Sequence, residues 1–141
     1  MEQRGIEFRE IKISSKDYGK PLKKVYFVIE NGRSIVMESF YRLDQKTQRQ
    51  IKALISKMAT IPNYQSPQIR YALSGYTYGE IKPKPHRFFF FQMFGDALIF
   101  FDYVVKKKAV LDSKTYQQIQ QKKERYEDAY QRDLPKRRRV F

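Results

Sequence analysis

Basic side chains gather at the ends of neighbouring apolar segments in the second half of the chain. In chain order they are Lys82, Lys84, His86, Arg87, Lys106, Lys107 and Lys108. Lysine and arginine neutralise phosphates, so such a set suits the backbone of a nucleic acid. It also suits metal-free RNA cleavage, which needs a base for the 2′-hydroxyl proton, cations for the crowded phosphorane and an acid for the leaving oxygen. A lysine among other cations can have a lowered pKa and act as that base, with a tyrosine or histidine as the acid.

The composition excludes several other kinds of site. The 141 residues contain no cysteine and a single histidine, His86. Disulfides, thiol nucleophiles, zinc ribbons, iron–sulfur clusters and multi-histidine metal centres are therefore excluded, and we expect neither a metal nor a cofactor. The formal net charge of +14 points to an anionic partner. Nucleic acid is the first choice, an acidic protein the second and a membrane surface the third.

No segment has the length and apolarity of a membrane span. The most apolar stretch, residues 97–105, has nine residues and is interrupted by Asp102, whereas a span needs about 20. The first residues also lack the apolar run of a signal peptide. We therefore expect a cytoplasmic protein with no membrane partner.

The sheet that must position the basic residues is predicted from β-branched and aromatic segments. Strands are expected over residues 25–29, 69–73, 76–82, 87–93 and 98–105. Short turns between the later strands favour a small antiparallel, meander-type sheet of four to five strands. The run Phe88–Phe91 lacks alternation, which predicts a central strand covered on both faces.

Helices are expected on either side of these strands in the sequence. Asp44 caps a helix that ends near Ala59, and its apolar residues recur with helical spacing. A last helix begins near Ser113 and ends at Gln131, with Tyr116, Ile119, Tyr126 and Tyr130 on one stripe. The expected class is α+β, with two N-terminal helices packed on the sheet and a C-terminal helix.

Residues 33–43 allow two interpretations. The dipeptide Asn31-Gly32 is a strong hairpin signal, so residues 33–39 could form a return strand. Alternatively, Ser34 caps a helix that places Val36, Phe40 and Leu43 on one face. The residues alone leave both open.

The chain divides into three parts by composition. Residues 1–22 form a polar extension that is either loosely attached or adds one edge strand, and residues 23–131 form the core domain. Residues 132–141 form a basic tail with five basic residues and one acid, which leaves most of the net charge on the body.

The predicted meander brings the basic groups to one end of the sheet. In such a sheet the end of one strand and the start of the next share an edge, so Lys82 meets Arg87. The strand that ends before Lys106 has the same direction as the strand that ends near Lys82. An alternative reading is that these lysines only protect strand edges from pairing with other sheets.

Several motifs, in order, resemble the RelE/ParE toxin superfamily of type II toxin–antitoxin systems, and most closely its HigB-like, phage-derived branch. The resemblance covers roughly residues 24–131. Its pieces are the strand Lys24–Ser34, the helix with Phe40 and Leu43, the segments Leu73–Gly75, Tyr78–Pro83 and Phe101–Lys108, the pair His86-Arg87, and the closing helix with Tyr126 and Tyr130. The resemblance implies a RelE-like fold and favours the helix over the hairpin after Asn31-Gly32.

The resemblance implies a toxin that cleaves mRNA on the translating ribosome and is neutralised by an antitoxin, of the helix-turn-helix type. Lys82 and Arg87 match basic residues of the family's central strands, and Lys106 and Lys107 match its basic pair after the last strand. We therefore predict four catalytic residues: Lys82, His86, Arg87 and Lys107. The predicted RNA contacts are Lys84, Lys106, Lys108, Arg70 and Tyr78. Two alternatives remain, a ParE-like inhibitor of DNA gyrase and a non-catalytic RNA-binding module.

Overall fold

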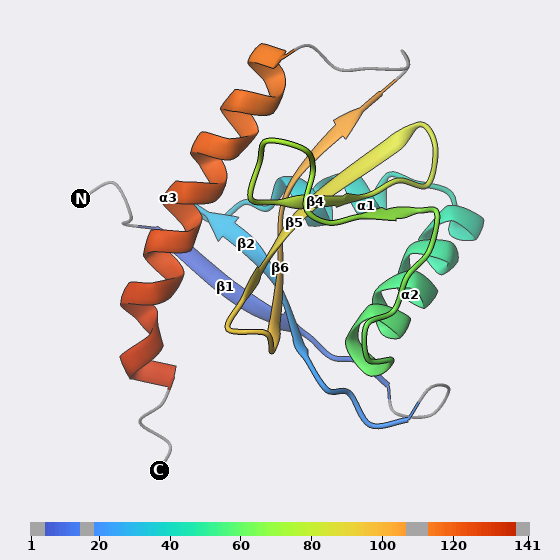
Figure 1. Cartoon of the computed structure of the whole chain (residues 1–141), viewed down its shortest axis with the longest axis horizontal. Coiled ribbons are helices and arrows are strands. Elements are labelled where there is room, and N and C mark those ends of the chain that lie inside the picture. Colours follow the sequence, from blue (N-terminus) through green and yellow to red (C-terminus); the bar gives the residue numbers. More distant parts are fainter. Residues whose placement is uncertain (1–4, 15–18, 107–112, 138–141) are drawn as a thin grey trace.

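The computed structural model describes residues 5–14, 19–106 and 113–137, and Figure 1 shows the arrangement of its elements. In chain order these are β1 (Ile6–Ile11), β2 (Lys24–Glu30), α1 (Ile35–Tyr41), α2 (Gln45–Thr60), β3 (Ile69–Arg70), β4 (Gly79–Ile81), β5 (His86–Met93), β6 (Ala97–Val105) and α3 (Ser113–Arg137). The α+β class is confirmed, with three helices and one sheet among the described residues. No helix in these residues is long and apolar enough to cross a membrane.

The sheet is mixed and six-stranded, with the order β1-β2-β6-β5-β4-β3. The predicted antiparallel meander of four to five strands is therefore wrong. Strands β3 to β6 do run antiparallel to their neighbours, but β2 enters beside β6 and parallel to it, with Val25 opposite Leu98. Two helices lie between β2 and the later strands in the sequence, which gives the chain the length that a parallel connection requires.

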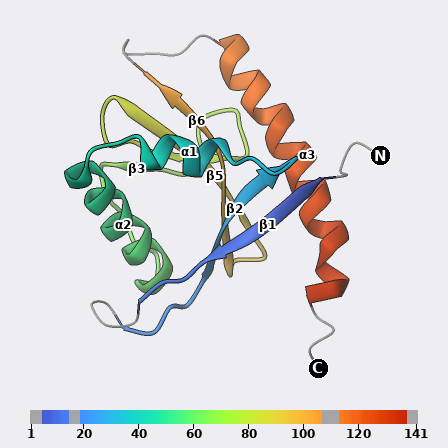
Figure 2. The same ribbon diagram turned by 180° about the vertical axis from the view of Figure 1, so that it is seen from behind.

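The N-terminal segment adds an edge strand, one of its two predicted alternatives. Strand β1 runs antiparallel to β2, from Ile6 opposite Glu30 to Ile11 opposite Val25. Its apolar side chains alternate between the faces, so that Phe8 packs on the α3 side and Ile11 on the opposite side. Figure 2 shows β1 beside β2 at this edge.

Helices α1 and α2 cover one face of the sheet. The Oγ atom of Ser34 accepts a hydrogen bond from the Met37 backbone N–H, which caps α1 and excludes the hairpin alternative. Asp44 caps α2 in the same way through Thr47, as predicted. The apolar side chains of both helices pack on Phe88, Phe90 and their neighbours in one buried cluster.

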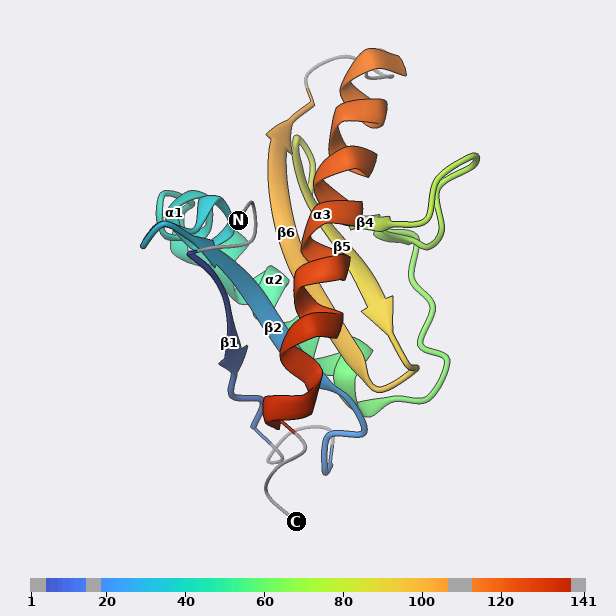
Figure 3. The same cartoon turned by 90° about the vertical axis from the view of Figure 1, so that its left-hand side faces the viewer.

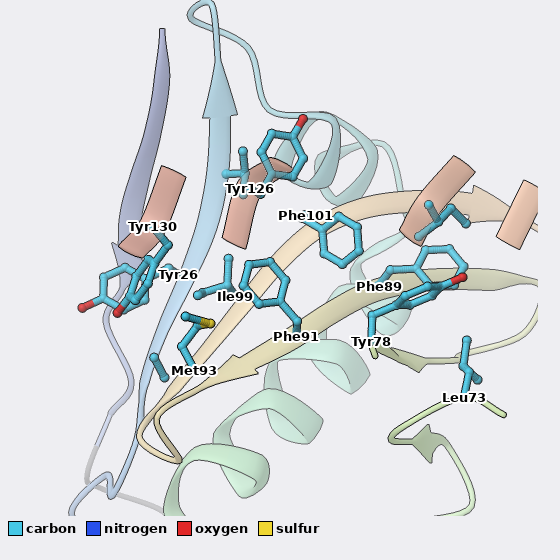
Figure 4. Close-up of a cluster of buried hydrophobic side chains, with 13 residues drawn as sticks. Tyr26, Leu73, Tyr78, Phe89, Phe91, Met93, Ile99, Phe101, Tyr126 and Tyr130 are labelled. Carbon is cyan, nitrogen blue, oxygen red and sulfur yellow. The ribbon is translucent and has the colours of Figure 1, made fainter. Parts of the chain in front are cut away.

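Helix α3 crosses the other face (Figure 3), where it covers a second cluster that is rich in aromatic rings (Figure 4). The predicted stripe is confirmed, because Ile119, Tyr126 and Tyr130 are buried there and Tyr116 packs against them. The helix continues to Arg137, beyond the predicted end at Gln131. Lys122, in the first half of α3, pairs with Asp102 of β6 at 3.2 Å and connects the helix to the sheet.

Strand β5 is the central strand that the Phe88–Phe91 run predicts. All four phenylalanines are at most 2% exposed and alternate between the two clusters. The pairing of β5 with β6 shifts register between Phe89 and Phe90, opposite Phe101. Because of this bulge, neighbouring Phe101 and Asp102 both contact the α3 side, through Tyr126 and Lys122 respectively.

Candidate nucleic-acid interface

Four basic side chains meet at the end of the sheet where β4 ends and β5 begins. They are Arg70 of β3, Lys82 after β4, Arg87 of β5 and Lys106 after β6, and we call them the cationic cluster. The backbone brings them together: Ile81 pairs with Phe88, and the Lys106 N–H donates to the Pro85 carbonyl at 2.7 Å. The convergence expected from the strand ends therefore holds for these residues.

A buried carboxylate lies at the centre of the cationic cluster. Glu80 is fully buried and is the cross-strand neighbour of Arg70. Its Oε2 atom accepts hydrogen bonds from Nε and Nη2 of Arg70 at 3.3 and 3.2 Å. Arg87 lies on its other side, with Nε 3.7 Å from Glu80 Oε1. The cluster therefore combines four basic side chains with one carboxylate, and this excess of basic groups suits the phosphates of a nucleic-acid backbone.

The pair Glu80–Arg87 is ordered but incompletely hydrogen-bonded. Arg87 is 6% exposed and its Nη1 donates to the His86 carbonyl at 3.2 Å. Within the described residues, Glu80 Oε1 and Arg87 Nε have no hydrogen-bond partner. Buried polar atoms are usually satisfied, so these two atoms mark an incompletely hydrogen-bonded polar centre beneath the more accessible members of the cluster. Arg70 is one of those members, with half of its side chain exposed.

The environment of the cluster lowers the pKa of two of its lysines. Burial, followed by the nearby charge of Arg70, lowers the pKa of Lys82 below its usual value. Burial, followed by Arg87, lowers the pKa of Lys106. A lowered pKa increases the fraction of neutral amine near pH 7, and only a neutral amine can accept a proton from a hydroxyl group.

His86 shares this end of the sheet with Arg87 but lies on the opposite face. Neighbouring residues of a strand point to opposite sides. The His86 ring accordingly stacks on Tyr103, a residue of the α1/α2 side, and its Nδ1 atom lies 2.7 Å from the Tyr103 hydroxyl. Asp44, the cap of α2, is within electrostatic range of His86. The structure therefore separates the predicted imidazole from the predicted cations.

The remaining predicted residues have different positions. Lys84 is exposed in the turn between β4 and β5. Tyr78 is fully buried between Phe89 and Phe101, and its hydroxyl donates to the Tyr116 carbonyl at 2.9 Å. Burial also raises the pKa of Tyr78. In this position its ring offers no surface on which a base could stack.

The predicted residues Lys107 and Lys108 lie outside the described part of the chain.

Glu80 is the member of the site that sequence reasoning missed. A strand of period two places Tyr78, Glu80 and Lys82 on the same side, and this spacing was the available signal. Among the described residues, no three side chains of the histidine, cysteine, aspartate and glutamate types gather as metal ligands would.

Comparisons of the chain with protein-family models, curated proteins and solved structures gave no match.

Proposed function

We propose that this protein is an RNA-cleaving toxin: an mRNA endoribonuclease that acts on the translating ribosome in the cytoplasm. The observation that carries the proposal is the cationic cluster, in which two lysines of lowered pKa flank the buried pair Glu80–Arg87. Cations bind the phosphate backbone. The same cations, held in place before the reaction, stabilise the negative charge that develops on a phosphorane.

The reaction needs only groups that the cluster contains. A neutral lysine, Lys82 or Lys106, takes the proton from a 2′-hydroxyl, and the 2′-oxygen forms a bond to the adjacent phosphorus. The bond from phosphorus to the 5′-oxygen breaks, and the other lysine, as an ammonium ion, returns a proton to that oxygen. The guanidinium group of Arg70, which is half exposed, contacts the developing charge, and that of Arg87 adds its positive charge from beneath. The products are a 2′,3′-cyclic phosphate and a 5′-hydroxyl end.

The resemblance to the RelE/ParE superfamily supplies the biological part of the proposal. It supports an antitoxin of the helix-turn-helix type as the neutralising partner, and the ribosome as the carrier of the mRNA substrate. The net charge of +14 is compatible with both, because ribosomal RNA and acidic protein segments are each anionic.

A second candidate is a non-catalytic RNA-binding module of the same fold. It is favoured by the location of the His86–Tyr103 pair, which is directed to the opposite face from Arg87 and leaves the cluster without an imidazole. Such a module binds RNA with strong salt dependence and has no toxicity.

Inducible expression in bacteria tests the proposal. We expect the wild type to arrest growth and the double variant Lys82→Met/Lys106→Met to relieve the arrest. The control is Lys12→Met/Lys20→Met, which removes the same charge from exposed positions outside the cluster. Transcript mapping then decides the mechanism: breaks within codons support cleavage, and intact transcripts with normal growth support the binding module. Arrest that persists in the Lys82/Lys106 variant would contradict the site.

A further inference from the structure

A pocket of about 610 Å³ lies on the edge of β5 beyond Gly79, the residue at which β4 begins. The segment between α2 and β3 forms one wall, and β5 and β6 form the floor through Phe90, Gln92 and Leu98. Its volume falls within the range of small-molecule sites, which is about 300–1,000 Å³. It is separate from the cationic cluster, none of whose members lines it.

An aromatic platform forms one side of this pocket. The Tyr71 ring lies nearly parallel to the Phe90 ring, with centroids 5.5 Å apart and planes 22° apart, yet Tyr71 remains 46% exposed. Gly79 makes this packing possible, because a Cβ atom at that position would come within 2.7 Å of the Tyr71 ring. A hydrogen bond with the Gln92 backbone further fixes the Tyr71 hydroxyl. An exposed tyrosine held flat in this way resembles the stacking surfaces of single-strand-binding proteins.

The rest of the lining is polar in a way that suits a nucleobase. Asn63, Gln65 and Gln92 contribute side-chain amides, which carry both donors and acceptors. These groups match the hydrogen-bonding edges of an unpaired base. Lys23 adds a cation at the rim for a neighbouring phosphate.

We propose that this pocket binds one unpaired nucleobase of a single-stranded RNA, by stacking on Tyr71. Arg70 of the cationic cluster directly precedes Tyr71 at the outer edge of the sheet. An RNA that passes around this edge can place a phosphate at the cluster, on the α3 side, and a base in the pocket, on the α1/α2 side. The inference rests on the proposed function, because it takes RNA as the substrate. It adds a site for the base to a cluster that otherwise contacts only the backbone.

Fluorescence anisotropy with a labelled single-stranded RNA of about eight nucleotides, a typical site size, tests the inference. We expect Tyr71→Leu to weaken binding roughly 5- to 140-fold, as the loss of one stacked base does. The slope of affinity against salt should stay the same, because no charge changes. Tyr71→Phe should keep the affinity. Tyr41→Leu, at an exposed tyrosine of α1, is the matched control.

The same RNA with abasic positions separates the outcomes. The proposal predicts that abasic substitution weakens wild-type binding and that Tyr71→Leu binds both RNAs equally. If the wild type binds the two RNAs with equal affinity, or if Tyr71→Leu binds RNA as tightly as the wild type, the proposal that the pocket binds a nucleobase is wrong. If Lys82→Met/Lys106→Met still weakens binding in that case, the proposed function survives without the pocket. A wild type that binds neither RNA overturns the pocket, and growth arrest with transcript mapping then tests the proposed function separately.

Discussion

The buried carboxylate beneath the cationic cluster makes a quantitative prediction about stability. The variant Glu80→Gln removes the negative charge and leaves Arg87, which is 6% exposed, without a counter-ion. Removing one partner of a buried ion pair typically lowers the free energy of unfolding by about 3–5 kcal/mol. The Arg87–Glu80 contact is long, at 3.7 Å, and the second partner, Arg70, is half exposed. Both facts place the expected loss near the lower limit, about 3 kcal/mol.

Urea unfolding followed by circular dichroism measures this loss. With a slope of about 2 kcal/mol per molar urea, the midpoint should fall by about 1.5 M. The matched control is Glu38→Gln, which breaks the ion pair with Arg33 on the exposed surface and should leave the midpoint unchanged. The double variant Glu80→Gln/Arg87→Met should be more stable than Glu80→Gln alone, because the uncompensated charge is gone. A Glu80→Gln midpoint equal to that of the wild type would refute the reasoning.

Three further predictions concern salt and pH. The double variant Lys82→Met/Lys106→Met should reduce the slope of log affinity for single-stranded RNA against log salt by about 1.4, or about 0.7 per lost contact, in anisotropy titrations. Because burial lowers the pKa of Lys82 below 10.5, the unfolded chain binds more protons just below that pH. The stability of the wild type relative to Lys82→Met should therefore increase as the pH rises towards 10.5, which urea unfolding checks. The hydrogen bond from Arg125 lowers the pKa of Glu30, so their pair stabilises the fold above pH 4.5 and loses this effect as the pH falls through the lowered pKa. In thermal melts over that acid range, the melting temperature of Glu30→Gln should fall less than that of the wild type as the pH is lowered.

The local elements of this fold were predictable because their signals are local. Ser34 and Asp44 are capping residues placed directly before apolar residues with helical spacing, and each caps a helix in the structure. The Phe88–Phe91 run predicted a strand with both faces covered, and the structure confirms it.

The sheet topology was not predictable in the same way. The residue pattern of β2 indicates which of its faces are buried, but it does not indicate which strand lies beside it. Its parallel partner β6 is reached only after two helices and three strands. Short turns favoured neighbours in sequence, and they gave the correct pairing for β3 to β6 alone.

The order of the strands predicted which end of the sheet carries the cationic cluster. It did not predict on which face of the sheet each side chain lies. Arg87 and His86 are neighbours in sequence and were assigned to one cluster, although a strand directs them to opposite sides. Glu80 was overlooked because one of three acids among the many cations of residues 69–108 resembles ordinary surface charge. Only the register of β3 against β4 brings it to Arg70.

The chemical identity of new RNA ends tests the central claim most directly. Transcripts from cells that express the wild type would be sequenced by a method that distinguishes 5′-hydroxyl from 5′-phosphate ends. Attack by a 2′-hydroxyl with lysines as base and acid predicts new 5′-hydroxyl ends within codons, which disappear in Lys82→Met/Lys106→Met and persist in Lys12→Met/Lys20→Met. New ends that carry a 5′-phosphate, or 5′-hydroxyl ends undiminished in the Lys82/Lys106 variant, would contradict the account.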